Sequence, residues 1–277
     1  MTDSPWTEYV RMPYTVGVYL AVNAIPDAYV VVDGPDCLFF KAEFVHGTHD
    51  LHSTLLDAQS RHRVIHTVAD TNKVVVDREA EIEALLNRVA SQPDAGAVFV
   101  TALPMTAITG SQYDRLARAV RVQTGKPVLE VPARSLQADW LDGYERVLAA
   151  LAEGLDLAPP GEPDEVAVVG LLLDRTEADH LANVREVTRL LEQGLGLRVA
   201  SVWPSNRPVE NLAAAGRART VVSLPYARRA ARVLAPRIGA NLVEADLLLG
   251  VRVSDEFVRA VGRATGLEGV ADGFIRR

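Results

Sequence analysis

Short runs rich in Val and Ile alternate with longer amphipathic segments along most of the chain, and this alternation strongly limits its fold. In the first half the expected strands are residues 28–33, 63–68, 96–101 and 126–132. Segments with helical periodicity lie at 38–58, 78–91, 111–124 and 139–155. Strands that alternate with helices in this way predict a parallel sheet covered by helices on both faces.

A proline-rich segment then interrupts both periodicities. Residues 155–165, LDLAPPGEPDE, contain three prolines and a glycine among acidic residues, so we expect a domain linker there. The alternation restarts with expected strands at 165–173, 197–203, 219–224 and 241–246 and expected helices at 178–193, 208–216, 226–237 and 254–265. The predicted fold class is α/β, with two Rossmann-like domains whose parallel sheets are flanked by helices. Their predicted bounds are residues 1–157 and 164–277.

Composition and charge exclude several classes of protein. Apolar residues make up 48% of the chain and charged residues 23%, which is the balance of a folded protein rather than a disordered one. The formal net charge of -7 argues against a nucleic-acid partner, which would need an excess of clustered basic residues. Basic residues do gather at helical spacing, and we expect them to form a solvated helix face: Arg228, Arg229, Arg232 and Arg237.

The chain has a single cysteine, Cys37, which excludes an intrachain disulfide framework. The first residues, MTDSPWTEYV, do not read as a secretory signal. No apolar run approaches the roughly 20 residues of a membrane span. We therefore expect a cytoplasmic protein with no membrane partner.

Ligands of open α/β sheets bind beyond the carboxyl ends of the strands, at the point where the strand order reverses. The candidate loops in the first half are 33–37, 69–73 and 102–111. Cys37 falls at or near the start of a predicted helix, whose partial positive charge favours a thiolate. The sequence leaves two interpretations open, a thiolate that acts as metal ligand or nucleophile and a small buried apolar side chain.

Three histidines follow at intervals of three residues: His46, His49 and His52. Imidazole suits transition metals, but the first and last are about 600° apart on a regular helix, so the three do not converge. A metal ligand among them and a polar surface or subunit contact both remain open. The motifs of dinucleotide, phosphate-loop and hydrolase sites are missing, and we expect Tyr113 and Tyr144 to be ordinary helix residues.

Several segments resemble the nitrogenase component 1-type oxidoreductases, a family that includes nitrogenase and the dark-operative protochlorophyllide reductases. DGPDC, residues 33–37, is similar to the family's His-Gly-Pro-x-Gly-Cys loop, whose cysteine binds an iron-sulfur cluster at the subunit interface. VFVTALPMTAITGSQYDRLAR resembles a segment in which a strand ends in a Thr-Cys or Ser-Cys pair before an Ile-Gly-Asp turn. PVLEVPARSLQADWLDGYERVLAAL resembles a strand, a proline and a Gly-Tyr helix. The resemblance implies these cofactor-binding residues: Gly34, Pro35, Asp36, Cys37, Thr101 and Gly110.

The chain departs from the family in its cysteines. The family usually draws three from each subunit, and the other two positions correspond roughly to Met12 or Pro13 and to Pro104. A cubane cluster normally needs four ligands, so one thiolate is too few. A two-fold homodimer would supply two thiolates, with Asp36 as a second ligand from each chain, or His46 or His49 in its place.

The resemblance implies a subunit of a nitrogenase-like oxidoreductase. Such a subunit would receive electrons from an ATP-dependent iron-sulfur reductase, through a cluster at an interface with a second copy or a paralogous subunit. The alternative is a non-catalytic relative that has lost the cluster and binds a metallocofactor, a tetrapyrrole or a partner subunit. A third interpretation, a two-domain binding protein with a small ligand in its cleft, has less support because of the short linker.

Overall fold

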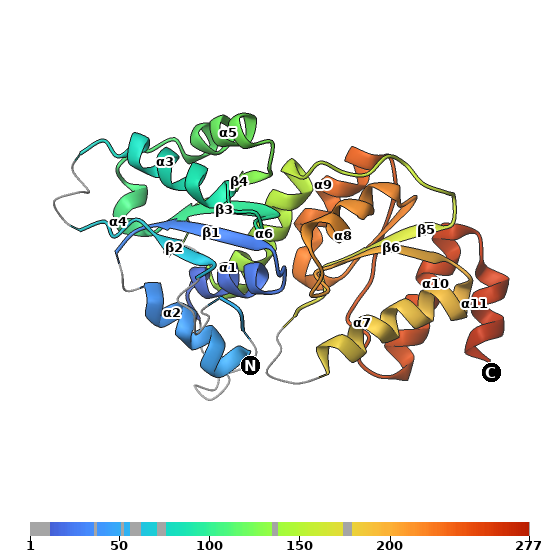
Figure 1. Cartoon of the computed structure of the whole chain (residues 1–277). Coiled ribbons are helices and arrows are strands. Elements are labelled where there is room, and N and C mark those ends of the chain that lie inside the picture. The colour runs from blue at the N-terminus through green and yellow to red at the C-terminus, as the bar shows by residue number, and fades with distance from the viewer. Residues whose placement is uncertain are drawn as a thin grey trace.

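Two four-stranded sheets form the frame of the protein (Figure 1). The computed structural model describes residues 12–35, 38–50, 53–55, 62–70, 76–134, 138–173 and 179–276. In spatial order the first sheet consists of β2 (Val64–His66), β1 (Ala28–Asp33), β3 (Ala97–Ala102) and β4 (Val128–Glu130). The second consists of β6 (Arg198–Trp203), β5 (Glu165–Val169), β7 (Thr220–Ser223) and β8 (Asn241–Glu244). All pairings are parallel and both sheets share one strand order, as the expected Rossmann-like architecture requires.

Helices cover both faces of each sheet. Those of the first half are α1 (Tyr14–Asn23), α2 (Leu38–Phe44), the π-helical turn η2 (Val45–His49), α3 (Glu79–Ala90), α4 (Pro104–Ala107), α5 (Tyr113–Thr124) and α6 (Trp140–Gly154). Those of the second half are α7 (His180–Arg189), the π-helical turn η4 (Leu190–Gly194), α8 (Val209–Ala213), the 3₁₀ turns η5 (Ala214–Arg217) and η6 (Pro225–Ala227), α9 (Arg228–Ile238), α10 (Val251–Thr265) and α11 (Glu268–Ile275).

Successive side chains of a strand point to opposite faces of the sheet, so each strand contributes to two cores. In β1, Val31 packs into the core beneath α3 and α5, whereas Val30 and Val32 belong to the core with α1 and α6. In β5, Val168 packs in the core with α7 and α10, and Val169 faces the core with α9. Strands buried on both faces are uniformly apolar, which explains the Val and Ile runs of the sequence.

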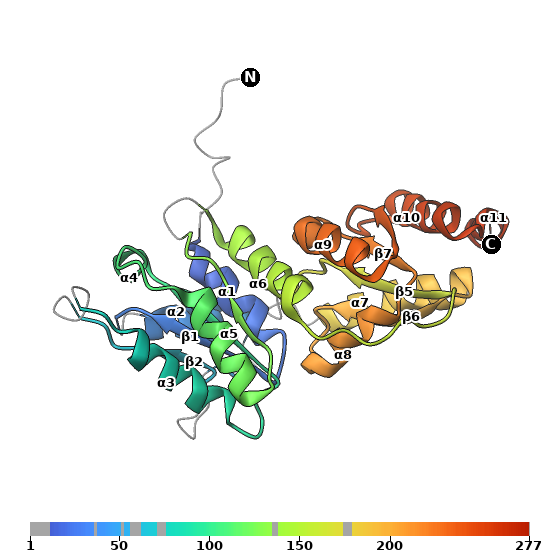
Figure 2. The ribbon, with the colours of Figure 1, turned by 90° about the horizontal axis from the view of Figure 1, so that it is seen from above.

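One apolar core continues from the first sheet to the second, because α1, α6 and α9 contribute to the same cluster. Figure 2 shows α6 beside α9 between the two sheets, and these helices are in contact. Residues 155–164 lead from α6 to β5 without a helix or strand. The division into residues 1–157 and 164–277 remains a proposal.

Helix α1 was absent from the sequence expectations because it has no polar face. All ten of its residues are buried, and a helix that is apolar all round gives no amphipathic signal. Two glycines let it approach α6 closely. A Cβ on Gly17 would lie 1.6 Å from the carbonyl oxygen of Trp140, and one on Gly143 would lie 2.0 Å from that of Tyr14.

The predicted helix 38–58 was too long. The helical turns end at His49, Asp50 is extended, and residues 53–55 are not helical. The reason is a buried polar contact, in which the Asn23 amide donates to Asp50 at 2.7 Å and Ser53 donates to Asn23 at 3.1 Å. The predicted strand 165–173 was also too long, since it ends at Val169 before Gly170, whose φ is +106°.

The four arginines of α9 are not simply a solvated face. Arg228 donates to the carbonyl oxygens of Ser223 and Ala245 at the ends of β7 and β8. Arg237 donates to those of Ala152 and Leu155 at 2.8 and 2.7 Å, at the end of α6. These contacts satisfy carbonyl groups at element ends, which helical spacing alone does not reveal. Among the described residues, no helix combines the length and hydrophobicity that a membrane span would require.

Candidate functional site

The candidate site lies at the carboxyl ends of β1 and β3. The chain leaves β1 for β2 on one side and returns to β3 on the other, so the strand order reverses between β1 and β3. The two loops that meet there begin at Gly34 and at Leu103, and they are bonded through the Leu103 N–H and the Asp33 carbonyl at 2.9 Å.

A buried carboxylate organises this edge. Asp33, the last residue of β1, is 1% exposed and accepts three side-chain hydrogen bonds. Thr67 donates to its Oδ1 at 2.5 Å, Arg78 donates to the same oxygen at 2.8 Å, and Tyr113 donates to Oδ2 at 2.7 Å. Thr106 donates to the Asp33 carbonyl oxygen at 2.6 Å. We call these five residues the Asp33 network.

The two buried charges of the network form an ion pair. Arg78 and Asp33 form an ion pair whose side chains are 4% and 1% exposed. Burial acts to lower the pKa of Arg78, but the charges of Asp33 and Glu81 and their hydrogen bonds together outweigh it and raise that pKa. Burial and the bond to Asp33 likewise raise the pKa of Tyr113, which keeps its hydroxyl protonated as a donor. Both oxygens of the Asp33 carboxylate accept hydrogen bonds, which holds the surroundings in one arrangement, whereas Nη2 of Arg78 has no hydrogen-bond partner among the described residues.

The same contacts fix the loop that leaves β1. The Gly34 N–H donates to the Thr67 hydroxyl at 3.2 Å, and its carbonyl accepts from the Ala69 N–H at 3.0 Å. A Cβ on Gly34 would lie 2.9 Å from the Leu103 side chain, so glycine allows the two loops to touch. The end of β1 is therefore tied to the ends of β2 and β3 immediately before the Asp36–Cys37 pair.

The structure brings together some of the residues predicted for the site. Gly34 and the half-buried Pro35 follow Asp33 directly, and Thr101 is the register partner of Val32 on β3. Thr101 is 1% exposed and, among the described residues, its hydroxyl has no hydrogen-bond partner. Gly110 lies in the exposed loop between α4 and α5 with φ +79°.

The predicted metal ligands are less completely described. Asp36 and Cys37 lie outside the described residues. The His46 side chain is exposed on η2, and the side chain of His49 is also outside the description. Over the parts of the chain that the structure describes, no three His, Cys, Asp or Glu side chains gather closely enough to hold a metal ion.

Sequence reasoning missed most of the Asp33 network. Tyr113 was expected to be an ordinary helix residue, but it begins α5 with its hydroxyl on Asp33. Tyr144 also has a specific contact, because its hydroxyl donates to the Leu171 carbonyl and accepts from the Leu173 N–H beyond β5. One signal was available in the sequence VVVD, where an acidic residue ends an apolar strand. A buried carboxylate needs hydrogen-bond donors, and the neighbouring parallel strands, which end at the same edge, must supply them.

Comparison with known proteins adds three findings. Residues 14–277 match a family model described as nitrogenase component 1 type oxidoreductase. The solved structures "Nitrogenase Cp1 at pH 5" and "Nitrogenase Cp1 at pH 6.5" each resemble the chain with a TM-score of 0.70 over 100% of its length, at 14% and 15% identity. The chain spans 56% and 54% of the length of those two chains. None of the curated protein sequences compared with it matches.

Proposed function

Since the chain belongs to the nitrogenase component 1 type oxidoreductase family, we propose that it is an oxidoreductase subunit that receives electrons through an iron-sulfur cluster shared between two subunits. The observation that carries the proposal is the Asp33 network, which holds the backbone immediately before Asp36 and Cys37. Redox sites function best on rigid supports, because a loop that shifts would change the ligand geometry and the potential.

Exposed apolar side chains around the same edge support a subunit interface. Phe40 is 74% exposed on α2, and Ile108 is 81% exposed after α4. Val68 and Val76, which follow β2, are 52% and 55% exposed. Exposed large apolar side chains beside a candidate site are compatible with a surface that another chain covers, although Val122 and Val251, elsewhere on the chain, are as exposed. We propose that the chain that covers this surface is a second copy of the protein or a paralogous subunit.

The donor set decides how a cluster would be held. A cluster normally takes four protein ligands, and a single chain offers one thiolate. Two chains related by a two-fold axis would offer Cys37 twice, and Asp36 or His46 from each chain would complete four ligands. When bound, such a cluster supplies one-electron transfer. The Asp33 network would hold the loop, and the exposed apolar side chains described above would exclude water from the cluster.

Cysteine and histidine variants test this proposal. Anaerobically purified protein should contain iron and sulfide and absorb visible light, and Cys37→Ser should lose both while its circular dichroism is unchanged. His46→Asn identifies the second ligand, since it keeps the cluster if Asp36 is that ligand and loses it if His46 is. Iron content that is the same in Cys37→Ser and in the unmodified chain would refute the role of Cys37. We further propose an ATP-dependent iron-sulfur reductase as the electron donor and the cytoplasm as the location.

One observation favours a second candidate, a non-catalytic scaffold of the same fold. The chain has a single cysteine where the family usually has three. Such a protein would bind a metallocofactor, a tetrapyrrole or a partner subunit without a resident cluster. A colourless protein that binds an added tetrapyrrole stoichiometrically and retains it in Cys37→Ser would support the scaffold and exclude the redox subunit.

A further inference from the structure

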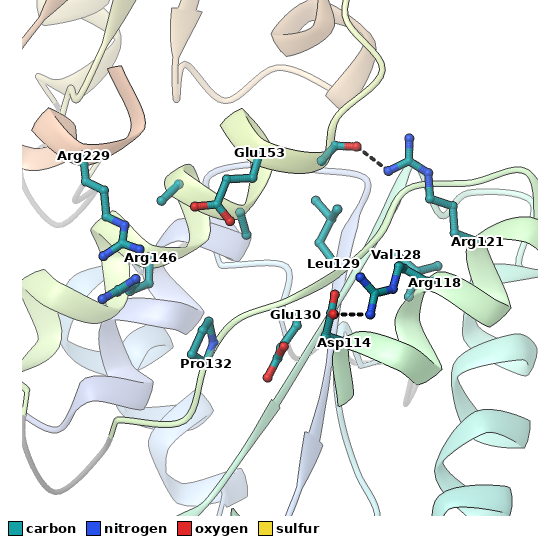
Figure 3. A pocket seen from close by; sticks show the side chains of 13 residues that line it. Asp114, Arg118, Arg121, Val128, Leu129, Glu130, Pro132, Arg146, Glu153 and Arg229 are labelled. Atoms are coloured by element: carbon teal, nitrogen blue, oxygen red, sulfur yellow. Dashed lines mark hydrogen bonds and ion pairs between the residues drawn. The ribbon is translucent and has the colours of Figure 1, made fainter. Parts of the chain in front are cut away.

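A cavity away from the Asp33 network has a volume of about 430 Å³ and runs along the outer edge of β4. Residues of α5 line one side and residues of α6 the other, and α9 contributes Arg229 (Figure 3). The volume falls in the range of small-molecule sites, roughly 300–1,000 Å³. Because α6 packs against α9, the cavity lies where the two halves of the chain meet.

The arginines of this cavity fall into two classes. On α5, Arg118 is paired with Asp114 at 2.5 Å, and Arg121 is paired with Asp156 at 2.6 Å. Arg146 and Arg229 differ, since neither guanidinium has an ion pair or hydrogen bond with any residue in the described ranges. Figure 3 shows their side chains close together at one end of the cavity.

These two cations repel each other. Burial lowers the pKa of Arg146, the nearby charges of Arg229 and Arg134 lower it further, and Tyr14 and Glu145 offset only part of this decrease. Guanidinium groups remain protonated in proteins, so this repulsion persists at neutral pH. Elsewhere in the same cavity each arginine has a carboxylate partner. An oxyanion between Arg146 and Arg229 would reduce the repulsion and accept hydrogen bonds from both.

Two carboxyl groups lie farther along the cavity. The carboxyl groups of Glu130, at the end of β4, and Glu153, on α6, have no hydrogen bond or ion pair within the described residues. Burial, followed by the charge of Asp114, raises the pKa of Glu130. Carboxylates accept hydrogen bonds, so this part of the cavity suits a donor such as ammonium or hydroxyl and disfavours a second negative charge.

We propose that the cavity along β4 binds a small ligand that has one oxyanion group, phosphate or carboxylate, and an ammonium or hydroxyl group at its other end. The oxyanion binds Arg146 and Arg229, and the donor binds Glu130 or Glu153. This site is independent of the Cys37 loop, so its test and that of the redox proposal can fail separately.

Calorimetric titration of the full chain with three probes tests the proposal. Phosphoethanolamine has phosphate and ammonium, 4-aminobutyrate has carboxylate and ammonium, and ethanolamine lacks the oxyanion. At least one of the first two should bind with saturation at millimolar concentration, and ethanolamine should bind at least about tenfold more weakly. Preference between the first two identifies the oxyanion. Saturation by neither, or equal binding of ethanolamine, would overturn the proposal.

Variants locate the binding. Arg146→Met keeps the aliphatic stem and should lower the affinity at least about tenfold. Arg229→Met should do the same, and because Arg229 is exposed this variant serves if Arg146→Met fails to fold. Arg252→Met, an exposed arginine of α10 paired with Glu256, is the matched control and should bind like the unmodified chain. Full affinity in both cavity variants would overturn the proposal.

Discussion

Replacing Tyr113 by Phe removes one oxygen atom from the Asp33 network and leaves the aromatic packing in place. Among the described residues, Tyr113 provides the only hydrogen bond to Oδ2 of Asp33, at 2.7 Å, and the carboxylate is 1% exposed. The variant therefore leaves a buried charged oxygen without a donor. Hydrogen bonds to charged groups contribute about 1.5–3 kcal/mol, so we expect a loss of this size in the free energy of unfolding. That loss corresponds to a decrease in Tm of roughly 3–12 °C.

The matched control is Tyr29→Phe. The Tyr29 hydroxyl also donates to a carboxylate, Asp94 at 2.8 Å, but this contact is exposed to solvent. Water can replace the lost donor there, so we expect a cost below about 1 kcal/mol. Differential scanning calorimetry of the two variants and the unmodified chain measures both losses. Equal decreases in Tm would refute the argument that burial makes the Asp33 network stabilising.

Two further predictions concern packing and pH. Gly17→Ala should lower the free energy of unfolding by about 3 kcal/mol or more, because the added Cβ has no room beside Trp140. Gly269→Ala, with open space around it in α11, should change that free energy by less than about 1 kcal/mol. Urea titration measures both changes. The hydrogen bonds from Arg217 hold the pKa of Glu165 below its ordinary value of 4.5, so the stability they contribute is present above that pH and is lost as the pH falls toward the folded-state pKa. The Tm of Glu165→Gln should therefore fall less on acidification than that of the unmodified chain, and parallel curves would contradict this.

The strands could be predicted because a doubly buried parallel strand must be apolar. β1 agrees with its expected bounds at both ends, and the other strands lie within a few residues of theirs. Helix α1 could not be predicted in this way, because its burial between the first sheet and α6 removes the polar face by which a surface helix is recognised.

The candidate site could be predicted only in part, for a different reason. A loop after a strand is visible in the sequence, and Gly34 and Pro35 lie where the topology rule places them. Partners that come from distant segments are not visible. Thr67, Arg78 and Tyr113 reach Asp33 from residues 34, 45 and 80 positions away, and each has an ordinary local context. Only the satisfaction of a buried charge relates them.

We propose above all that two chains share one cluster through Cys37. Native mass spectrometry of anaerobically purified protein, with iron quantified in the same sample, tests it most directly. We expect an assembly that contains two subunits of this size, 30.0 kDa each for a homodimer, with one bound iron-sulfur cluster that Cys37→Ser removes. A single chain without iron, from cells that assemble iron-sulfur clusters, would contradict it.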